Sequence, residues 1–99
     1  MRRGTTPTHT FTTDIDLTDA EAIYITYKQN DKTVIEKEKT DLTITEDSLT
    51  VKLTQNETLA FVLDVPVRMQ IRARFADGTA VASQVMSTRA DVILKEGVI

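Results

Sequence analysis

One stretch constrains the fold of this chain more than any other. Between residues 67 and 75, apolar and polar side chains alternate at every position. The apolar members are Val67, Met69, Ile71, Ala73 and Phe75, and the polar members are Arg68, Gln70, Arg72 and Arg74. Because successive side chains of a β-strand point to opposite faces, this alternation predicts a strand with one buried face and one face in water.

The composition favours strands elsewhere in the chain as well. The 99 residues include 17 Thr, nine Val and eight Ile, which are stiff at χ1 and pack well on a pleated surface. Shorter alternating or apolar runs, separated by turn residues, predict further strands. These are expected at residues 8–15, 22–28, 33–39, 42–44 and 48–53, with a last short strand or pairing tail at 91–94.

Asn30 and Asp31 predict the first hairpin, between strands 22–28 and 33–39. Both residue types tolerate positive φ and bond to their own backbone, so they are typical of tight turns.

Asp77-Gly78 predicts a second hairpin, and its register can be argued from burial. A plain two-residue loop would place Gln84 and Met86 beside Met69 and Ile71. A type I turn with Gly78 as a left-handed bulge residue would place Val81 and Val85 there. Because burying an unpartnered Gln amide costs free energy, we expect the bulged turn.

The pattern Leu-Thr-x-x-Glu occurs at residues 17–21 and again at 53–57, each time beside a strand. In a capping box, the Thr hydroxyl and the Glu carboxylate each accept a hydrogen bond from a free N–H at a helix start. We therefore expect short helical turns near residues 18–21 and 54–60.

About seven short strands with close-set turns predict an all-β, antiparallel β-sandwich of two sheets. The length suits one domain. We expect residues 1–7 to form a flexible N-terminal lead-in and residues 8–99 to form a single β-sandwich domain.

The charge and residue usage disfavour several classes of function. The net charge is −3, whereas nucleic-acid binding usually needs clustered cations, and the absence of Cys rules out thiolate ligands. No apolar h-region follows the first charged residues, and the longest apolar run, residues 59–63, is far too short to span a bilayer. We expect a soluble protein without a signal peptide that contacts neither membrane nor nucleic acid.

No motif predicts catalysis, a metal or a cofactor. His9 is the only His, and no nucleophile motif accompanies it, so an edge-strand role is expected. Residues 14–19 superficially look like a calcium loop, but Asp19 replaces the required Gly and Ile25 stands where a Glu ligand is needed. We expect no catalytic residue, no metal ligand and no cofactor.

Two surfaces are candidates for interaction. The first is a stripe formed by Arg68, Arg72 and Arg74, with Tyr24 on the less buried face of its own strand. The stripe either binds an anionic ligand or forms cross-strand ion pairs with acidic residues such as Glu36 and Glu38.

The second candidate surface is the apolar C-terminal region, which carries Ile93, Leu94, Val98 and Ile99. An apolar tail on a small domain either completes its own sheet or docks on another copy.

Read together, six stretches resemble a family of small proteins encoded among the tail genes of phages and prophages of Gram-positive bacteria. The stretches are TPTHTF (6–11), YITYKQN (24–30), LTQNET (53–58), VRMQIR (67–72), DGTA (77–80) and ILKEGVI (93–99). The layout is similar to the immunoglobulin-like sandwich at the start of some phage upper-baseplate proteins, without the larger segments that those proteins carry. The resemblance transfers no functional residues.

The resemblance implies an immunoglobulin-like fold for the sandwich. It also implies a non-enzymatic structural or assembly module of a phage tail or baseplate, located in the bacterial cytoplasm during expression, with a place in the virion tail as one destination. Its partners would be proteins, either further copies of itself or other tail components. The alternative hypothesis is a module that binds carbohydrate or an acidic polymer through Tyr24 and the Arg stripe.

Overall fold

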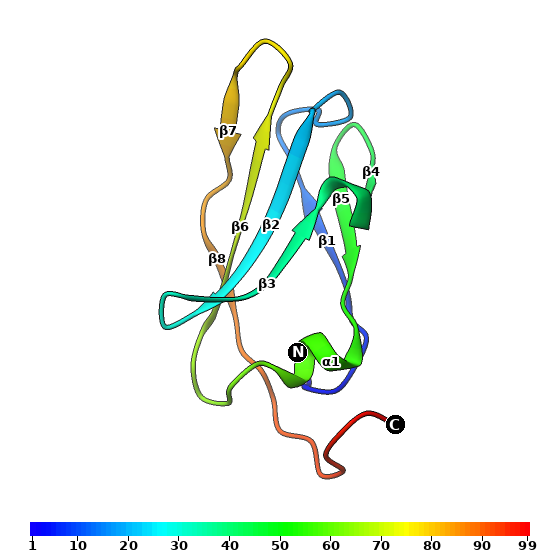
Figure 1. Cartoon of the computed structure of the whole chain (residues 1–99), viewed down its shortest axis with the longest axis vertical. Helices are drawn as coiled ribbons and strands as arrows, with labels where there is room; N and C mark the ends of the chain where they lie inside the picture. The colour runs from blue at the N-terminus through cyan, green and yellow to red at the C-terminus, as the bar shows by residue number, and fades with distance from the viewer.

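The computed structural model describes residues 1–99 as a sandwich of two antiparallel β-sheets (Figure 1). The smaller sheet has the order β1-β5-β4, with bounds Thr8–Thr12, Ser48–Lys52 and Leu42–Ile44. The larger sheet has the order β3-β2-β6, and β7 and β8 both pair with the outer side of β6. Its strands are β3 (Lys32–Glu38), β2 (Ala22–Gln29), β6 (Val67–Arg74), β7 (Ala80–Ala82) and β8 (Met86–Thr88). The predicted all-β sandwich is confirmed.

Strand β6 shows the alternation predicted from its sequence. Val67, Met69, Ile71 and Ala73 are buried, whereas the three arginines are exposed and Gln70 is half-buried. The buried face meets side chains from the smaller sheet, including Leu49 and Val51, in a single core. Full burial of one such aliphatic side chain contributes about 1.5–3 kcal/mol, so the burial of this face stabilises the fold.

The β2–β3 hairpin turns at Asn30 and Asp31, as predicted. Their φ values are 49° and 62°, and two consecutive positive values are the signature of a type I′ turn.

The β6–β7 hairpin confirms the bulged turn but only half of the register derived from it. Gly78 has a φ of 88° and donates its N–H to the Phe75 carbonyl at 3.0 Å. Val81 then lies opposite Ala73 on the inner face, as expected. Val85 does not follow it inward; Met86 takes the position opposite Met69.

The slip occurs at Ser83. Its N–H donates to the Ile71 carbonyl at 2.9 Å, and its hydroxyl accepts the Ile71 N–H at 3.0 Å. Because the hydroxyl takes the place of a backbone acceptor, the return strand breaks here and resumes one residue out of step. Val85 is left 45% exposed.

One of the two predicted capping boxes forms. Helix α1 spans Gln55–Leu59, and Thr54 is its N-cap. The Thr54 hydroxyl accepts the Glu57 N–H at 3.2 Å, and the Glu57 carboxylate accepts the Thr54 N–H at 2.8 Å. The helix carries the chain from β5 of the smaller sheet to β6 of the larger one (Figure 1).

The helical turn predicted at residues 18–21 is wrong. The Asp16 carboxylate accepts both the N–H of Thr18 at 2.9 Å and its hydroxyl at 2.7 Å, which produces a turn without a helix. The carboxylate of Glu21 faces Arg74 instead. A one-turn 3₁₀ helix, η1 (Lys39–Asp41), occupies what was expected to be a plain link.

Residues 1–7, expected as a lead-in, lie against the C-terminal part of the chain at the lower end of the molecule (Figure 1). Arg3 donates its N–H to the Asp91 carbonyl at 3.2 Å, and Arg2 and Asp91 form a parallel bridge. Residues 91–94 make this single bridge and no strand. The only α-helix has five residues, so no helix here could cross a bilayer.

Candidate interaction surfaces

The outer face of the larger sheet brings together the four residues predicted to share a surface. Tyr24 of β2 lies directly opposite Arg72 of β6. On the same face of β6, Arg74 lies two residues from Arg72 in one direction and Arg68 lies four residues from it in the other. Tyr24 is 40% exposed, as its place in the alternation of β2 predicts.

The expected cross-strand pairs with Glu36 and Glu38 do not form. Both glutamates lie on β3, and β2 separates that strand from β6, so the two side-chain rows stand about 9.5 Å apart. Arg74 instead faces Glu21, with 3.6 Å between Nη2 and Oε2, and both side chains are more than half exposed. Exposed pairs of this kind contribute little stability. No carboxylate lies within 4 Å of Arg68 or Arg72.

Two shallow hollows lie over this face. One, of about 380 Å³, is lined by Tyr24, Glu36, Arg72 and Arg74 among others. The other, of about 440 Å³, includes Lys28 and Arg68, and it shares Glu36 and Arg72 with the first. The surface therefore offers two unpaired guanidinium groups and one aromatic ring to a ligand.

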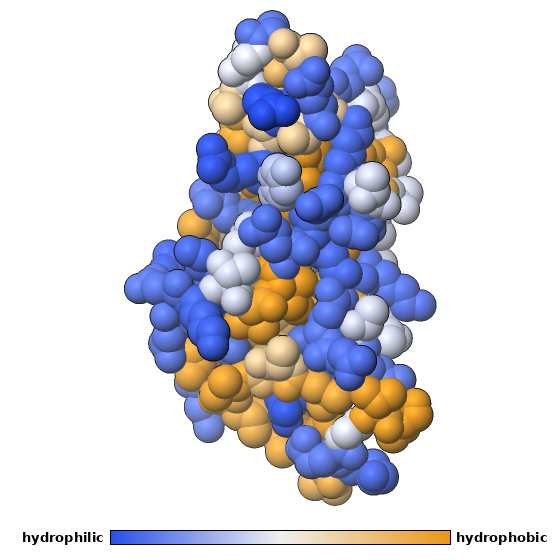
Figure 2. Space-filling view, in the orientation of Figure 1, coloured by the Kyte–Doolittle hydropathy of each residue, from blue (hydrophilic) through white to orange (hydrophobic).

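The C-terminal segment, residues 92–99, is the most apolar exposed part of the molecule. Leu94 is 99% exposed and Ile99 is 86% exposed, and Val92 and Val98 each leave more than half of their surface in water. Apolar surface gathers at the lower end of the molecule, where this segment lies (Figure 2). Ile93 differs from the others, because it is half-buried and packs so closely on Gly4 that a Cβ there would lie 2.9 Å from its Cδ1.

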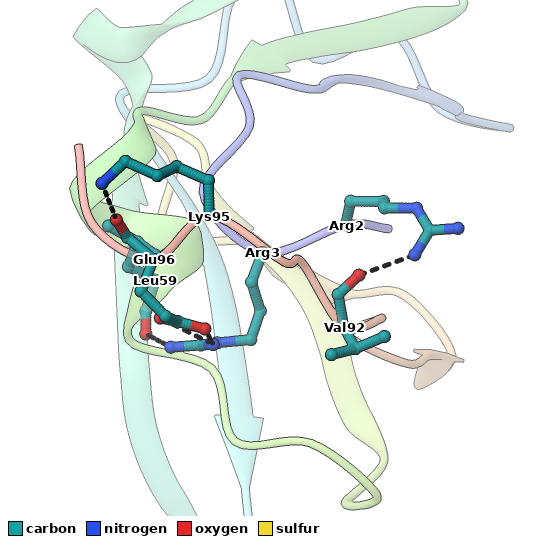
Figure 3. Close-up of polar contacts among 6 residues, drawn as sticks. All are labelled: Arg2, Arg3, Leu59, Val92, Lys95 and Glu96. Carbon is teal, nitrogen blue, oxygen red and sulfur yellow. Dashed lines mark hydrogen bonds and ion pairs between the residues drawn. The ribbon is translucent and has the colours of Figure 1, made fainter. Parts of the chain in front are cut away.

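Side-chain hydrogen bonds hold the C-terminal segment to the domain (Figure 3). Arg2 donates to the Val92 carbonyl at 2.6 Å, and the Arg3 guanidinium donates to the Leu59 carbonyl at 2.9 Å and to the Glu96 carboxylate at 3.2 Å. The Gln55 amide pairs with the backbone of Ile99 at 2.9 and 3.3 Å. No sheet pairing holds residues 92–99, so this segment is expected to open more readily than the strands.

A groove that the sequence did not reveal runs between the two sheets along one side of the sandwich. Its volume is about 530 Å³, and it lies between β1 with the loop that follows and the broken β7–β8 strand. Its apolar lining includes Phe11, Ile15, Leu17, Val81 and Met86. These residues come from distant parts of the chain; the only sequence signal was the uncharged, Thr-rich edge strand at residues 8–12.

His9 lies in β1 with its Nδ1 2.8 Å from the hydroxyl of Tyr27. Burial lowers the pKa of His9 below its ordinary value, and the positive N-terminus lowers it further. Burial, with a smaller contribution from Glu57, raises the pKa of Tyr27, which therefore stays protonated. His9 thus carries a hydrogen bond between the two sheets. No group of three or more His, Asp or Glu side chains lies close enough to hold a metal ion.

Fold and surfaces together define a small all-β sandwich with an exposed apolar segment and a cationic sheet face. Comparisons with protein-family models, with curated proteins and with solved structures found no match to this chain.

Proposed function

We propose that this protein is a non-enzymatic structural module that works through protein–protein contacts. The observation that carries the proposal is the C-terminal segment, in which four large apolar side chains lie mostly in water within eight residues. Single exposed apolar residues are normal on a soluble domain, whereas a contiguous group marks an interaction site.

We also propose that the sandwich is immunoglobulin-like. The support is the strand order: β1-β5-β4 corresponds to B-E-D of an immunoglobulin domain, and β3-β2-β6-β7 corresponds to C′-C-F-G. On this assignment, strand A has no counterpart, and the place beside β1 where it would pair is open.

The proposed setting is the tail or baseplate of a phage or prophage of Gram-positive bacteria. Its support is the resemblance of residues 6–11, 24–30 and 93–99, among others, to small tail-associated proteins. Partners would be further copies of the chain or other tail components. The non-enzymatic part is supported by His9, the only histidine, whose Nδ1 is engaged by the buried Tyr27 hydroxyl.

Size-exclusion chromatography with light scattering tests the proposal on the full chain and on a copy truncated after Leu94. The truncation removes Val98 and Ile99 together with the bonds of Glu96 and Ile99, and it leaves every strand intact. We expect the full chain to associate as its concentration rises, and the truncated chain to stay monomeric with a similar melting temperature. A full chain that is strictly monomeric at high concentration would contradict self-assembly.

A second candidate function is binding of an anionic polymer or carbohydrate on the outer sheet face. It is favoured by the absence of carboxylate partners for Arg68 and Arg72 next to Tyr24. Replacing Arg68, Arg72 and Arg74 by Gln should then abolish binding to a polyanion such as heparin and leave the melting temperature nearly unchanged. A sharp fall in melting temperature would instead identify the arginines as structural.

A further inference from the structure

The edge strands of the two sheets are protected to different degrees. The edge strand β3 carries Lys32, Glu36, Lys37 and Glu38, and charged side chains on an edge discourage pairing with another chain. The edge strand β1 has the sequence Thr-His-Thr-Phe-Thr, with no acidic or basic residue except His9 and no proline. It is paired with β5 on one side only.

The hydrogen bonds at the two ends of β1 show which backbone groups are free. The Pro7 carbonyl accepts the Leu53 N–H at 3.0 Å, and the Thr13 N–H donates to the Asp47 carbonyl at 2.8 Å, so odd-numbered residues face β5. In an antiparallel pair, bonded groups alternate along the strand. The N–H and C=O groups of Thr8, Thr10 and Thr12 therefore point away from the sheet, toward an open edge.

The groove described above lies beside this open edge. Phe11 and Leu17, from β1 and the loop after it, form part of its apolar floor, and Val81 and Met86 close it on the far side. A strand added to β1 would bond to three threonine backbones and place every second side chain over this floor.

We propose that the free edge of β1 and the adjoining groove receive residues 92–99 of a second copy of this chain as an added strand. The proposal rests on the proposed function and specifies how copies assemble. In an extended conformation Val92, Leu94, Glu96 and Val98 share one face, so three of the four exposed apolar side chains of the segment would face the groove together.

The geometry of the monomer favours a second copy as the source of the segment. The molecule is 48 Å long, the C-terminal segment lies at its lower end, and the loop after β1 lies at its upper end (Figure 1). As long as β8 stays paired with β6, residues 86–91 lead away from the groove, and the segment that follows them lies far from the groove of its own copy. Asp14 is the only charged residue lining the groove, so nearly all of the lining suits an apolar strand.

Donor and acceptor are different surfaces, so each copy can engage two neighbours. An interface of this kind is heterologous, and it generates rings or open filaments instead of closed twofold dimers.

Three variants, two of them with matched controls, separate the surfaces. Thr10→Pro removes one outward N–H and leaves the bonds to β5 in place; Thr10→Ala is its matched control, because both changes lose the contact between the Thr10 and Thr50 hydroxyls. Leu94→Asp places a charge in the segment, with Leu94→Met as its control. Ile15→Asp, at an exposed position in the groove, serves as a second acceptor variant that does not alter a strand.

Sedimentation velocity on each variant and on mixtures tests the proposal. Thr10→Pro, Ile15→Asp and Leu94→Asp should each raise the dissociation constant at least about tenfold, because each removes strand pairing or the burial of a large apolar side chain. An equimolar mixture of Thr10→Pro and Leu94→Asp should form dimers, because one partner keeps a donor and the other keeps an acceptor. The control variants should associate like the wild type.

The outcomes distinguish this inference from the function on which it rests. If truncation after Leu94 abolishes association but Thr10→Pro and Ile15→Asp associate normally, the segment docks elsewhere and the strand-addition proposal is overturned while self-assembly stands. If the mixture of the two deficient variants stays monomeric, the proposal is equally overturned. A monomeric wild type would overturn both.

Discussion

Replacing Gln29 by Met should destabilise the fold strongly, because the Gln29 side chain is a buried polar group with several backbone partners. Gln29 lies at the end of β2 and is only 5% exposed. Its amide donates to the carbonyls of Val62 at 2.8 Å and Val65 at 3.0 Å, and its oxygen accepts the Val62 N–H at 2.8 Å. One side chain thus satisfies three backbone groups of the loop that leads into β6.

The magnitude follows from those three groups. A buried backbone group without a partner costs about 1–3 kcal/mol, and the partial exposure of Val62 and Val65 lets water replace some of the lost bonds. Since Met has nearly the shape of Gln, packing changes little, and we expect a loss of about 2–4 kcal/mol in the free energy of unfolding. At about 4–8 °C per kcal/mol for a domain of this size, the melting temperature should fall by about 10–25 °C.

Urea and thermal unfolding, followed by circular dichroism, measure the effect. The matched control is Gln84→Met, because Gln84 is exposed and its side chain makes no hydrogen bond, so its stability should change by less than about 0.5 kcal/mol. If Gln29→Met loses less than about 1 kcal/mol, the three bonds do not anchor this loop, and the reasoning is refuted.

Three further changes test other local features. Thr54→Ala removes the cap of α1 and should cost about 1 kcal/mol in urea unfolding, whereas an unchanged stability would mean that the capping box contributes nothing. Gly78→Ala should cost about 1 kcal/mol from backbone strain alone, because the φ is 88° and no atom lies within 4 Å of the added Cβ; a loss above about 3 kcal/mol would point to a clash that the structure lacks. Burial would raise the pKa of Glu57, but hydrogen bonds from Lys37 and Thr54 outweigh it and lower the pKa. Stability should therefore fall as the pH drops below the ordinary Glu value of 4.5 toward the folded pKa, and Lys37→Met should make that fall shallower in pH-dependent urea unfolding; an equal slope in both proteins would contradict this.

Features that depend on a few neighbouring residues were predictable from the sequence. The alternation in residues 67–75 gave the central strand, Asn30 and Asp31 gave a turn, and Gly78 gave the bulge, because each requirement is local. The helical turn at residues 18–21 was not predictable with the same rule, since Asp16 competes with Glu21 for the Thr18 backbone. Similarly, the register of Val85 depended on one hydrogen bond, which the Ile71 N–H donates to the Ser83 hydroxyl.

The same distinction between local and long-range features applies to the candidate surfaces. The exposure of Tyr24 and of the arginines followed from the alternation of single strands. Their pairing with Glu36 and Glu38 did not occur, because it depended on the strand order, which places β2 between β3 and β6. The groove beside β1 was beyond sequence reasoning, because its lining comes from residues 10–17 and 71–86, which meet only in the folded sandwich.

Amide hydrogen exchange at Thr8, Thr10 and Thr12, resolved by NMR, tests the assembly mechanism most directly. In dilute monomer these amides face an open edge, so they should exchange fast; in the concentrated, associated protein they should become protected, and truncation after Leu94 should abolish that protection. Equal exchange rates at these three positions in monomer and assembly would contradict strand addition at β1.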